Sequence, residues 1–174
     1  QHGDLWISSS PELGVLGFGK GTEWEKNETA IVNAANRGGI TGSGIDGRIT
    51  RAGGRHLKKD RNRMPVIKGQ PRYQGYKCRI MTGNAVITGQ KSSKHRYKNL
   101  YGNFVIHAVG PNYDEEVANA GGDEPAGLIS GDHLLRSAYA ASMHKAAEEG
   151  ISYIGFSLLS TGIFRGPQDM EKVM

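Results

Sequence analysis

Short apolar runs recur along the chain and predict the strands of a sheet. The clearest are Ala30 to Asn36, Phe104 to Val109 and Ile151 to Leu159, in which apolar side chains follow one another with little alternation. Such runs are typical of strands that are covered on both faces. A shorter strand is predicted within Cys78 to Thr88, around the Thr82-Gly83 turn.

Helical patterns separate these strands. One helix is predicted from Asp46 to Lys59, with an acidic N-terminal residue and with Gly53-Gly54 weakening or interrupting it. A second is predicted from Asp132, as its N-cap, to Glu149, after a long insertion at Asn112 to Ser130. A last helix begins after Pro167. This alternation predicts an α/β sandwich with helices on both faces of the sheet.

Two loops follow predicted strands and carry the signs of a ligand site. The first contains Gly38, Gly39, Gly42, Gly44 and Gly47, and the second is Ser160 to Pro167. Glycine lets backbone N–H groups approach an anion, and a following helix adds its positive N-terminal end. Ligands of such folds lie at the carboxyl ends of strands. The sequence therefore predicts one pocket between the loops, suited to a diphosphate, although no Walker A Lys-Ser/Thr pair closes the first loop.

Composition narrows the class of protein. The 174 residues suit one domain, 1–174, and the net charge of +5 suits an anionic ligand. The basic segments Lys58 to Lys77 and Lys91 to Tyr101 are interpreted as exposed connections, so nucleic acid is not expected as a partner. No apolar run approaches the ~20 residues of a membrane span, and no signal peptide opens the chain. We expect an intracellular protein, cytoplasmic or nuclear, without membrane attachment.

Few side chains offer catalytic chemistry. Asp46 is a candidate to hold or deprotonate a water beside a bound diphosphate, or it is only a helix N-terminal acid. Asn36 is a candidate ligand contact, or a brace of the turn. His107 lies inside an apolar strand, which favours a hydrogen-bonded core histidine over a base. The single Cys78 excludes an internal disulfide and is interpreted as a buried apolar residue. The other histidines lack metal-ligand spacing, so no metal is predicted.

Five motifs, in this order and over nearly the whole chain, resemble the macrodomains, which bind ADP-ribose. They are A-I-V-N-A-A-N at Ala30 to Asn36, G-x-G-I-D-G at Gly42 to Gly47, T-G-x-A at Thr82 to Ala85, V-I-H-A-V-G-P at Val105 to Pro111 and L-L-S-T-G-I-F at Leu158 to Phe164. The ungapped interval from Asn36 to Asp46 is similar to the MacroD-like hydrolytic branch, which removes ADP-ribose from side chains and deacetylates O-acetyl-ADP-ribose.

The resemblance implies a three-layer α/β/α sandwich with a central mixed sheet, here with truncated terminal strands. It implies Asn36 and Asp46 as catalytic residues, with Asn36 on the distal ribose and Asp46 on the attacking water. Asp4 and Leu5 are implied near the adenine. The remaining implied ADP-ribose contacts are Ala35, Gly42, Ser43, Gly44, Ile45, Ser160, Thr161, Gly162, Ile163 and Phe164, the last walling the ribose. The resemblance implies no cofactor, and we expect a monomer.

The sequence also departs from the family's pattern. Thr41 and Ser43 replace glycines, and Thr50 replaces a common histidine. Arg165 stands where glycine is usual and either clamps a phosphate or obstructs the pocket. A non-catalytic reader of ADP-ribose and a binder of poly(ADP-ribose) or nucleic acid therefore remain as alternatives to a hydrolase.

Overall fold

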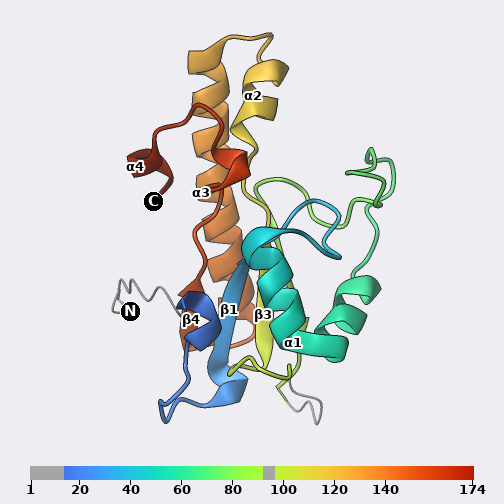
Figure 1. Ribbon diagram of the computed structural model, residues 1–174, viewed down its shortest axis with the longest axis vertical. Helices are drawn as coiled ribbons and strands as arrows, with labels where there is room; N and C mark the ends of the chain where they lie inside the picture. The colour runs from blue at the N-terminus through green and yellow to red at the C-terminus, as the bar shows by residue number, and fades with distance from the viewer. Residues whose placement is uncertain (1–13, 92–96) are drawn as a thin grey trace.

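The computed structural model describes residues 14–91 and 97–174, and they fold around one four-stranded sheet (Figure 1). The strands are β1 (Thr29–Ala34), β2 (Ala85–Gly89), β3 (Phe104–Ala108) and β4 (Tyr153–Phe156). Their order is β2-β3-β1-β4; β1 is parallel to β3 and β4, and β2 is antiparallel to β3. The predicted mixed sheet is confirmed.

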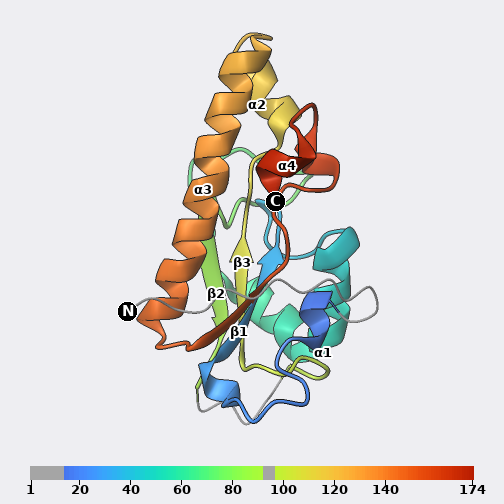
Figure 2. The same cartoon turned by 90° about the vertical axis from the view of Figure 1, so that its left-hand side faces the viewer.

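Helices cover both faces of this sheet. They are α1 (Gly44–Arg63), α2 (Tyr113–Asn119), α3 (Glu124–Glu148) and α4 (Met170–Val173), with short 3-10 turns η1 (Gly14–Gly17), η2 (Lys26–Glu28) and η3 (Ile163–Arg165). Figure 2 shows α1 and α3 on opposite sides of the strands. The three-layer sandwich predicted from the alternation of strands and helices is therefore confirmed.

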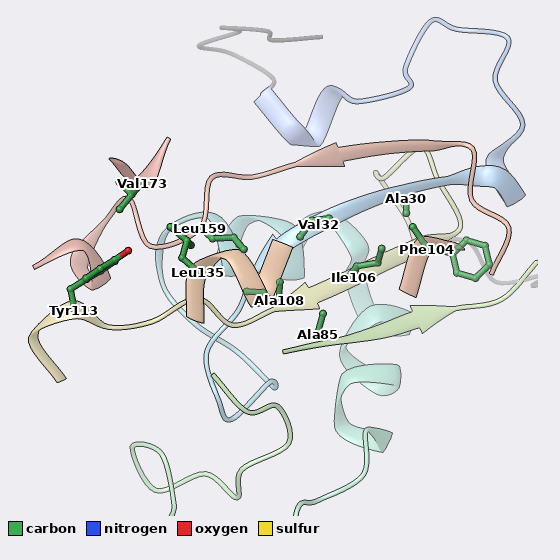
Figure 3. Close-up of a cluster of buried hydrophobic side chains, with 12 residues drawn as sticks. Ala30, Val32, Ala85, Phe104, Ile106, Ala108, Tyr113, Leu135, Leu159 and Val173 are labelled. Atoms are coloured by element: carbon green, nitrogen blue, oxygen red, sulfur yellow. The ribbon is translucent and has the colours of Figure 1, made fainter. Parts of the chain in front are cut away.

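Successive side chains of β1 serve the two faces in turn, as the strand geometry requires. Ala30 and Val32 pack toward α3, in a cluster that also contains Ile106 and Leu135 (Figure 3). Ile31 packs toward α1 instead, in a cluster that also contains Ile49, Leu57, Tyr97, Leu100 and Val105. Because both faces are buried, the strands need apolar residues at successive positions, and this is the pattern the sequence carries.

The predicted insertion at Asn112 to Ser130 is wrong, since most of it is helical. It forms α2 and the first turns of α3, whose N-cap is Asp123 rather than Asp132; Asp123 Oδ1 accepts from Ala126 N at 3.1 Å. The glycines that suggested a loop allow the two helices to touch. A Cβ on Gly127 would lie 2.4 Å from Cα of Val117, and one on Gly131 2.4 Å from the ring of Tyr113.

The helix α1 bends at Gly54, where the sequence predicted a weakness. Gly54 has φ 66° and ψ −153°, a conformation that is almost restricted to glycine. The helix therefore consists of two limbs, one before and one after Gly54, and it begins at Gly44 and continues to Arg63, beyond the predicted Lys59.

Candidate functional site at the carboxyl edge of the sheet

The two loops predicted to hold a ligand leave the same edge of the sheet. One follows β1 and the other follows β4, and these strands are parallel neighbours. Ser157 joins their ends: its Oγ donates to the carbonyl of Val32 at 2.7 Å and accepts from the N–H of Ala34 at 3.0 Å. The prediction that both loops share one edge is confirmed. That a ligand lies between them stays a prediction.

Asn36, which ends the first strand motif, braces the loop that follows it. Its Oδ1 accepts from the N–H groups of Gly38 and Gly39 at 3.0 and 3.2 Å, and its Nδ2 donates to the carbonyl of Thr41 at 2.8 Å. The side chain is only half-buried. The turn-bracing role is therefore present, and the half-exposed amide also borders the edge where ribose contact was predicted.

The first loop runs into the N-terminus of α1. Ser43 is the exposed N-cap residue, and its side chain makes no capping hydrogen bond. Gly44 has φ +56°, and no heavy atom lies within 4 Å of the place a Cβ would take. N–H groups at an open helix start suit an anionic ligand. A Cβ on Gly42, in contrast, would lie 2.4 Å from Oδ2 of Asp46, so this carboxylate lies directly against the loop.

Asp46 is held by a fully buried arginine. Its exposed fraction is 3%, and that of Arg61 is 0%. Arg61 Nη1 donates to Asp46 Oδ1 and to the hydroxyl of Thr50, and Nη2 donates to Asp46 Oδ2 at 3.1 Å. Arg61 Nε donates to the carbonyl of Gly39 at 2.6 Å. A buried charge is tolerated only when it is paired and hydrogen-bonded, as it is here.

This pair depends on the bend in α1. Asp46 and Arg61 are 15 residues apart, which corresponds to about 22 Å along a straight helix. The chain changes direction at Gly54, and the second limb of α1 runs back beside the first (Figure 1). Arg61 on the second limb thereby reaches Asp46 in the first turn. The sequence did not reveal Arg61, because it is one of many cationic residues in the segment.

A chain of buried polar groups links Asp46 to His107 on β3. Asn33 Nδ2 donates to Asp46 Oδ1 at 2.8 Å and lies 3.0 Å from His107 Nδ1. His107 Nε2 lies 3.0 Å from the hydroxyl of Thr88 on β2. The NH2 group of Asn33 satisfies both contacts if it donates one hydrogen to Asp46 Oδ1 and the other to His107 Nδ1. Nδ1 is then an acceptor, so the neutral His107 ring carries its proton on Nε2.

Burial, and secondarily the positive charge of Arg61, hold the pKa of His107 well below its usual value of 6.5. The ring is 0% exposed. His107 is therefore a neutral, hydrogen-bonded core residue, and the interpretation drawn from its apolar strand is confirmed.

The second loop combines a buried anchor with an exposed tip. Ser160 has φ 56° and is buried, and its Oγ donates to the carbonyl of Pro111 at 2.7 Å, which ties the loop to the segment after β3. Ile163 is 84% exposed, and Phe164 is half-buried. Arg165 Nη1 donates to the carbonyl of Gln168 at 2.7 Å. This bond turns Arg165 toward its own loop.

The predicted contact residues fall into three groups. Ser43, Gly44, Gly162 and Ile163 are exposed, while Asn36, Gly42, Ile45, Thr161 and Phe164 are half-buried. Ala35 and Ser160 are buried, and the N–H of Ala35 already donates to the carbonyl of Ala108 at 2.8 Å. Asp4 and Leu5 lie outside the described residues, and their adenine contacts stay predictions.

Two surface hollows are lined by residues outside these loops. One, of about 460 Å³, is lined by residues at the opposite end of β1, among them Trp24, Lys26 and Asn103. The other, of about 450 Å³, lies between α3 and α4 and is lined by Asp132, Leu135, Arg136 and Lys172. Neither is lined by a predicted site residue, and the chemistry of the carboxyl edge, not hollow size, identifies the candidate site.

No helix within 14–91 and 97–174 is long and apolar enough to span a membrane. In the same ranges, no cluster of three or more His, Cys, Asp or Glu side chains is placed to bind a metal ion.

The family model for the macro domain matches residues 32–173 of this chain. A macro domain-containing protein of Caldanaerobacter subterraneus is 37% identical over 148 residues, which cover 85% of this chain and 69% of that protein. The chain therefore belongs to the macro domain family. The resemblance read from the five sequence motifs is confirmed.

Two further relatives carry more specific descriptions. O-acetyl-ADP-ribose deacetylase 1 of Pantoea vagans is 34% identical over 143 residues, covering 80% of this chain and 66% of that protein. The Oceanobacillus iheyensis macrodomain solved with ADP is 27% identical, with a TM-score of 0.58, and the match covers 82% of this chain and 63% of that one. The chain thus spans about two thirds of the length of its relatives.

Other structures of the Oceanobacillus macrodomain carry an asparagine-to-alanine and an aspartate-to-alanine substitution ten residues apart. Asn36 and Asp46 have the same interval in this chain.

Proposed function

We propose that this chain binds ADP-ribose at the carboxyl edge of the sheet and hydrolyses bonds to its distal ribose. The substrates would be mono-ADP-ribosylated protein side chains, O-acetyl-ADP-ribose, or both. The observation that carries the proposal is the meeting of two loops at one edge, one of which opens a helix N-terminus. Family membership and the deacetylase name of the Pantoea relative support it.

The residues take separate roles in this proposal. The diphosphate lies against the backbone from Gly42 to Ile45, where the N-terminus of α1 attracts anions. The loop from Ser160 to Phe164 closes over the other side, and its exposed Ile163 and half-buried Phe164 gain cover from the ligand. Asn36 donates the second N–H of its Nδ2 to a hydroxyl of the distal ribose, because its Oδ1 already accepts from Gly38 and Gly39 and its other N–H is bonded to Thr41.

The hydrolytic step is proposed at Asp46. In the described contacts its Oδ2 accepts one hydrogen bond, from Arg61, and it lies against Gly42. A lone pair on this oxygen orients a water for attack. For an ADP-ribosylated acid, the water oxygen bonds to the anomeric carbon as the bond to the acceptor oxygen breaks; the protein carboxylate leaves and takes up the proton that the water gives up.

A non-catalytic reader of ADP-ribose is the second candidate, and one observation favours it. Asp46 is only 3% exposed, and both of its oxygens are bonded to Arg61. A carboxylate used in this way braces the loop without contacting a water at the ligand.

Turnover assays separate the two candidates. Wild type is incubated with a mono-ADP-ribosylated acceptor and with O-acetyl-ADP-ribose, and ADP-ribose affinity is measured by calorimetry. We expect turnover of at least one substrate and a loss of about 100-fold or more in Asp46→Asn, whose affinity stays within about tenfold. Binding without any turnover by wild type would establish the reader. Absence of binding would remove both candidates.

A further inference from the structure

Arg61 is the largest of the fully buried side chains among the described residues. Arginine is almost never fully buried unless it is paired, and no apolar requirement of the core explains it. Its position at the end of the second limb of α1 places the guanidinium beneath the glycine loop.

The guanidinium joins both ends of that loop. Nε holds the carbonyl of Gly39 near the start, at 2.6 Å, and the two terminal nitrogens hold Asp46 just past the end. Thr50, one turn after Asp46, takes a further hydrogen bond from Nη1. The backbone from Gly39 to Asp46 is thereby spanned by one side chain.

The guanidinium also removes an electrostatic conflict. The Asp46 carboxylate lies against Gly42, in the loop proposed to receive a diphosphate, and two like charges so close in a partly dry site repel strongly. Arg61 carries the compensating charge within hydrogen-bonding distance of both carboxylate oxygens. An anionic ligand then meets a neutral pair and the positive end of α1.

We propose that Arg61 is a positioning residue of the ADP-ribose site: it fixes the glycine loop and neutralises Asp46 so that the diphosphate is accepted. The proposal rests on ADP-ribose binding as the function of this edge. It does not require hydrolysis, so it holds for either candidate above.

The test is a charge cycle read out by ADP-ribose calorimetry on folded protein, with thermal unfolding measured on the same samples. At pH 7.5, Arg61→Met leaves the carboxylate unpaired, and we expect roughly 100-fold weaker binding. The double variant Arg61→Met with Asp46→Asn has no charge in the pair and recovers to within about tenfold of wild type. Arg63→Met, an exposed cation two residues away, is the matched control and binds like wild type.

The double variant separates positioning from simple support of the fold. Both variants lack the Arg61 side chain, so a purely structural role predicts equally weak binding in both. Neutralisation of Asp46 predicts instead that binding recovers only where Asp46→Asn has removed the carboxylate beside Gly42.

An Arg61→Met variant that binds like wild type, or a double variant that binds as weakly as Arg61→Met, overturns the assignment of Arg61 while the proposed function stands. If Arg61→Met does not fold, Arg61→Lys keeps the charge: binding within about tenfold of wild type supports the assignment, and a larger loss overturns it. Wild type that fails to bind ADP-ribose overturns both proposals.

Discussion

The contacts of Asp46 with Arg61 decide which roles its carboxylate can take. In the sequence Asp46 has two interpretations, a helix N-terminal acid or a catalytic acid, and nothing points to a partner. In the structure its carboxylate is enclosed by Arg61, Asn33 and the loop backbone at Gly42. The same contacts that make it a candidate to orient water also make it a brace of the loop.

At this scale His107 gives a prediction about pH and stability. Its pKa is held well below 6.5 in the folded protein. Just below pH 6.5, the imidazole is therefore protonated in the unfolded chain but stays neutral in the folded one. The stability due to neutral His107 is complete above pH 6.5 and is lost as the pH falls below it. We expect the free energy of unfolding to drop by up to about 1.4 kcal/mol per pH unit there.

Urea unfolding at pH 7.5, 6.0 and 5.0 measures this slope. In His107→Gln the contribution disappears, so the difference between wild type and the variant should shrink as the pH falls. His133→Gln, on an exposed position of α3, is the control and should keep the wild-type slope. Parallel curves for wild type and His107→Gln would contradict the prediction.

Among the secondary-structure elements, α1 decides most about the candidate site. Its first limb presents the helix N-terminus to the edge, and its second limb returns Arg61 to Asp46. The bend between them needs the backbone conformation of Gly54, which residues other than glycine rarely adopt.

Gly54→Ala should therefore weaken ADP-ribose binding, although Gly54 itself is not a predicted ligand contact. We expect a loss of about 1–3 kcal/mol in stability from the backbone conformation, and a loss of affinity as Arg61 moves away. Gly69→Ala is the control, because Gly69 also has positive φ and open space around a Cβ, but it lies in a surface turn. It should lose some stability and keep its affinity for ADP-ribose. Equal affinity in both variants would contradict this role of the bend.

In the whole molecule, charge is divided between regions. Residues 29–113 contain sixteen Lys and Arg residues but only two acidic residues. Both carboxylates accept hydrogen bonds: Asp46 from Arg61, and Asp60 from the hydroxyl of Tyr97 at 2.9 Å. Residues 114–174 hold ten acids and four Lys and Arg. The candidate edge adjoins the first region through α1, so the overall field favours the approach of an anion.

The two faces of the sheet should unfold together if 1–174 is one domain, as the sequence predicts. Ile106 packs toward α3 and Ile31 toward α1, and both are buried. We expect Ile106→Ala and Ile31→Ala each to cost about 2–5 kcal/mol. Urea transitions followed by far-UV circular dichroism and by tryptophan fluorescence should coincide in both variants. Separate transitions for the two probes would show two units instead.

The sequence by itself determined the class of fold, the family and the edge that the two predicted loops share, because these depend on local signals. Continuous apolar runs specify buried strands, glycines after Asn36 specify the loop, and Gly53-Gly54 marks the weak point of α1. The sequence-based prediction of a loop was wrong where glycine allows two helices to pack closely, as at Gly127 and Gly131 between α2 and α3. Only the tertiary structure decided the partner of Asp46, since the contact with Arg61 requires a helix to bend back over 15 residues. No periodicity in a sequence encodes such a return, because it arises from the direction the chain takes after Gly54.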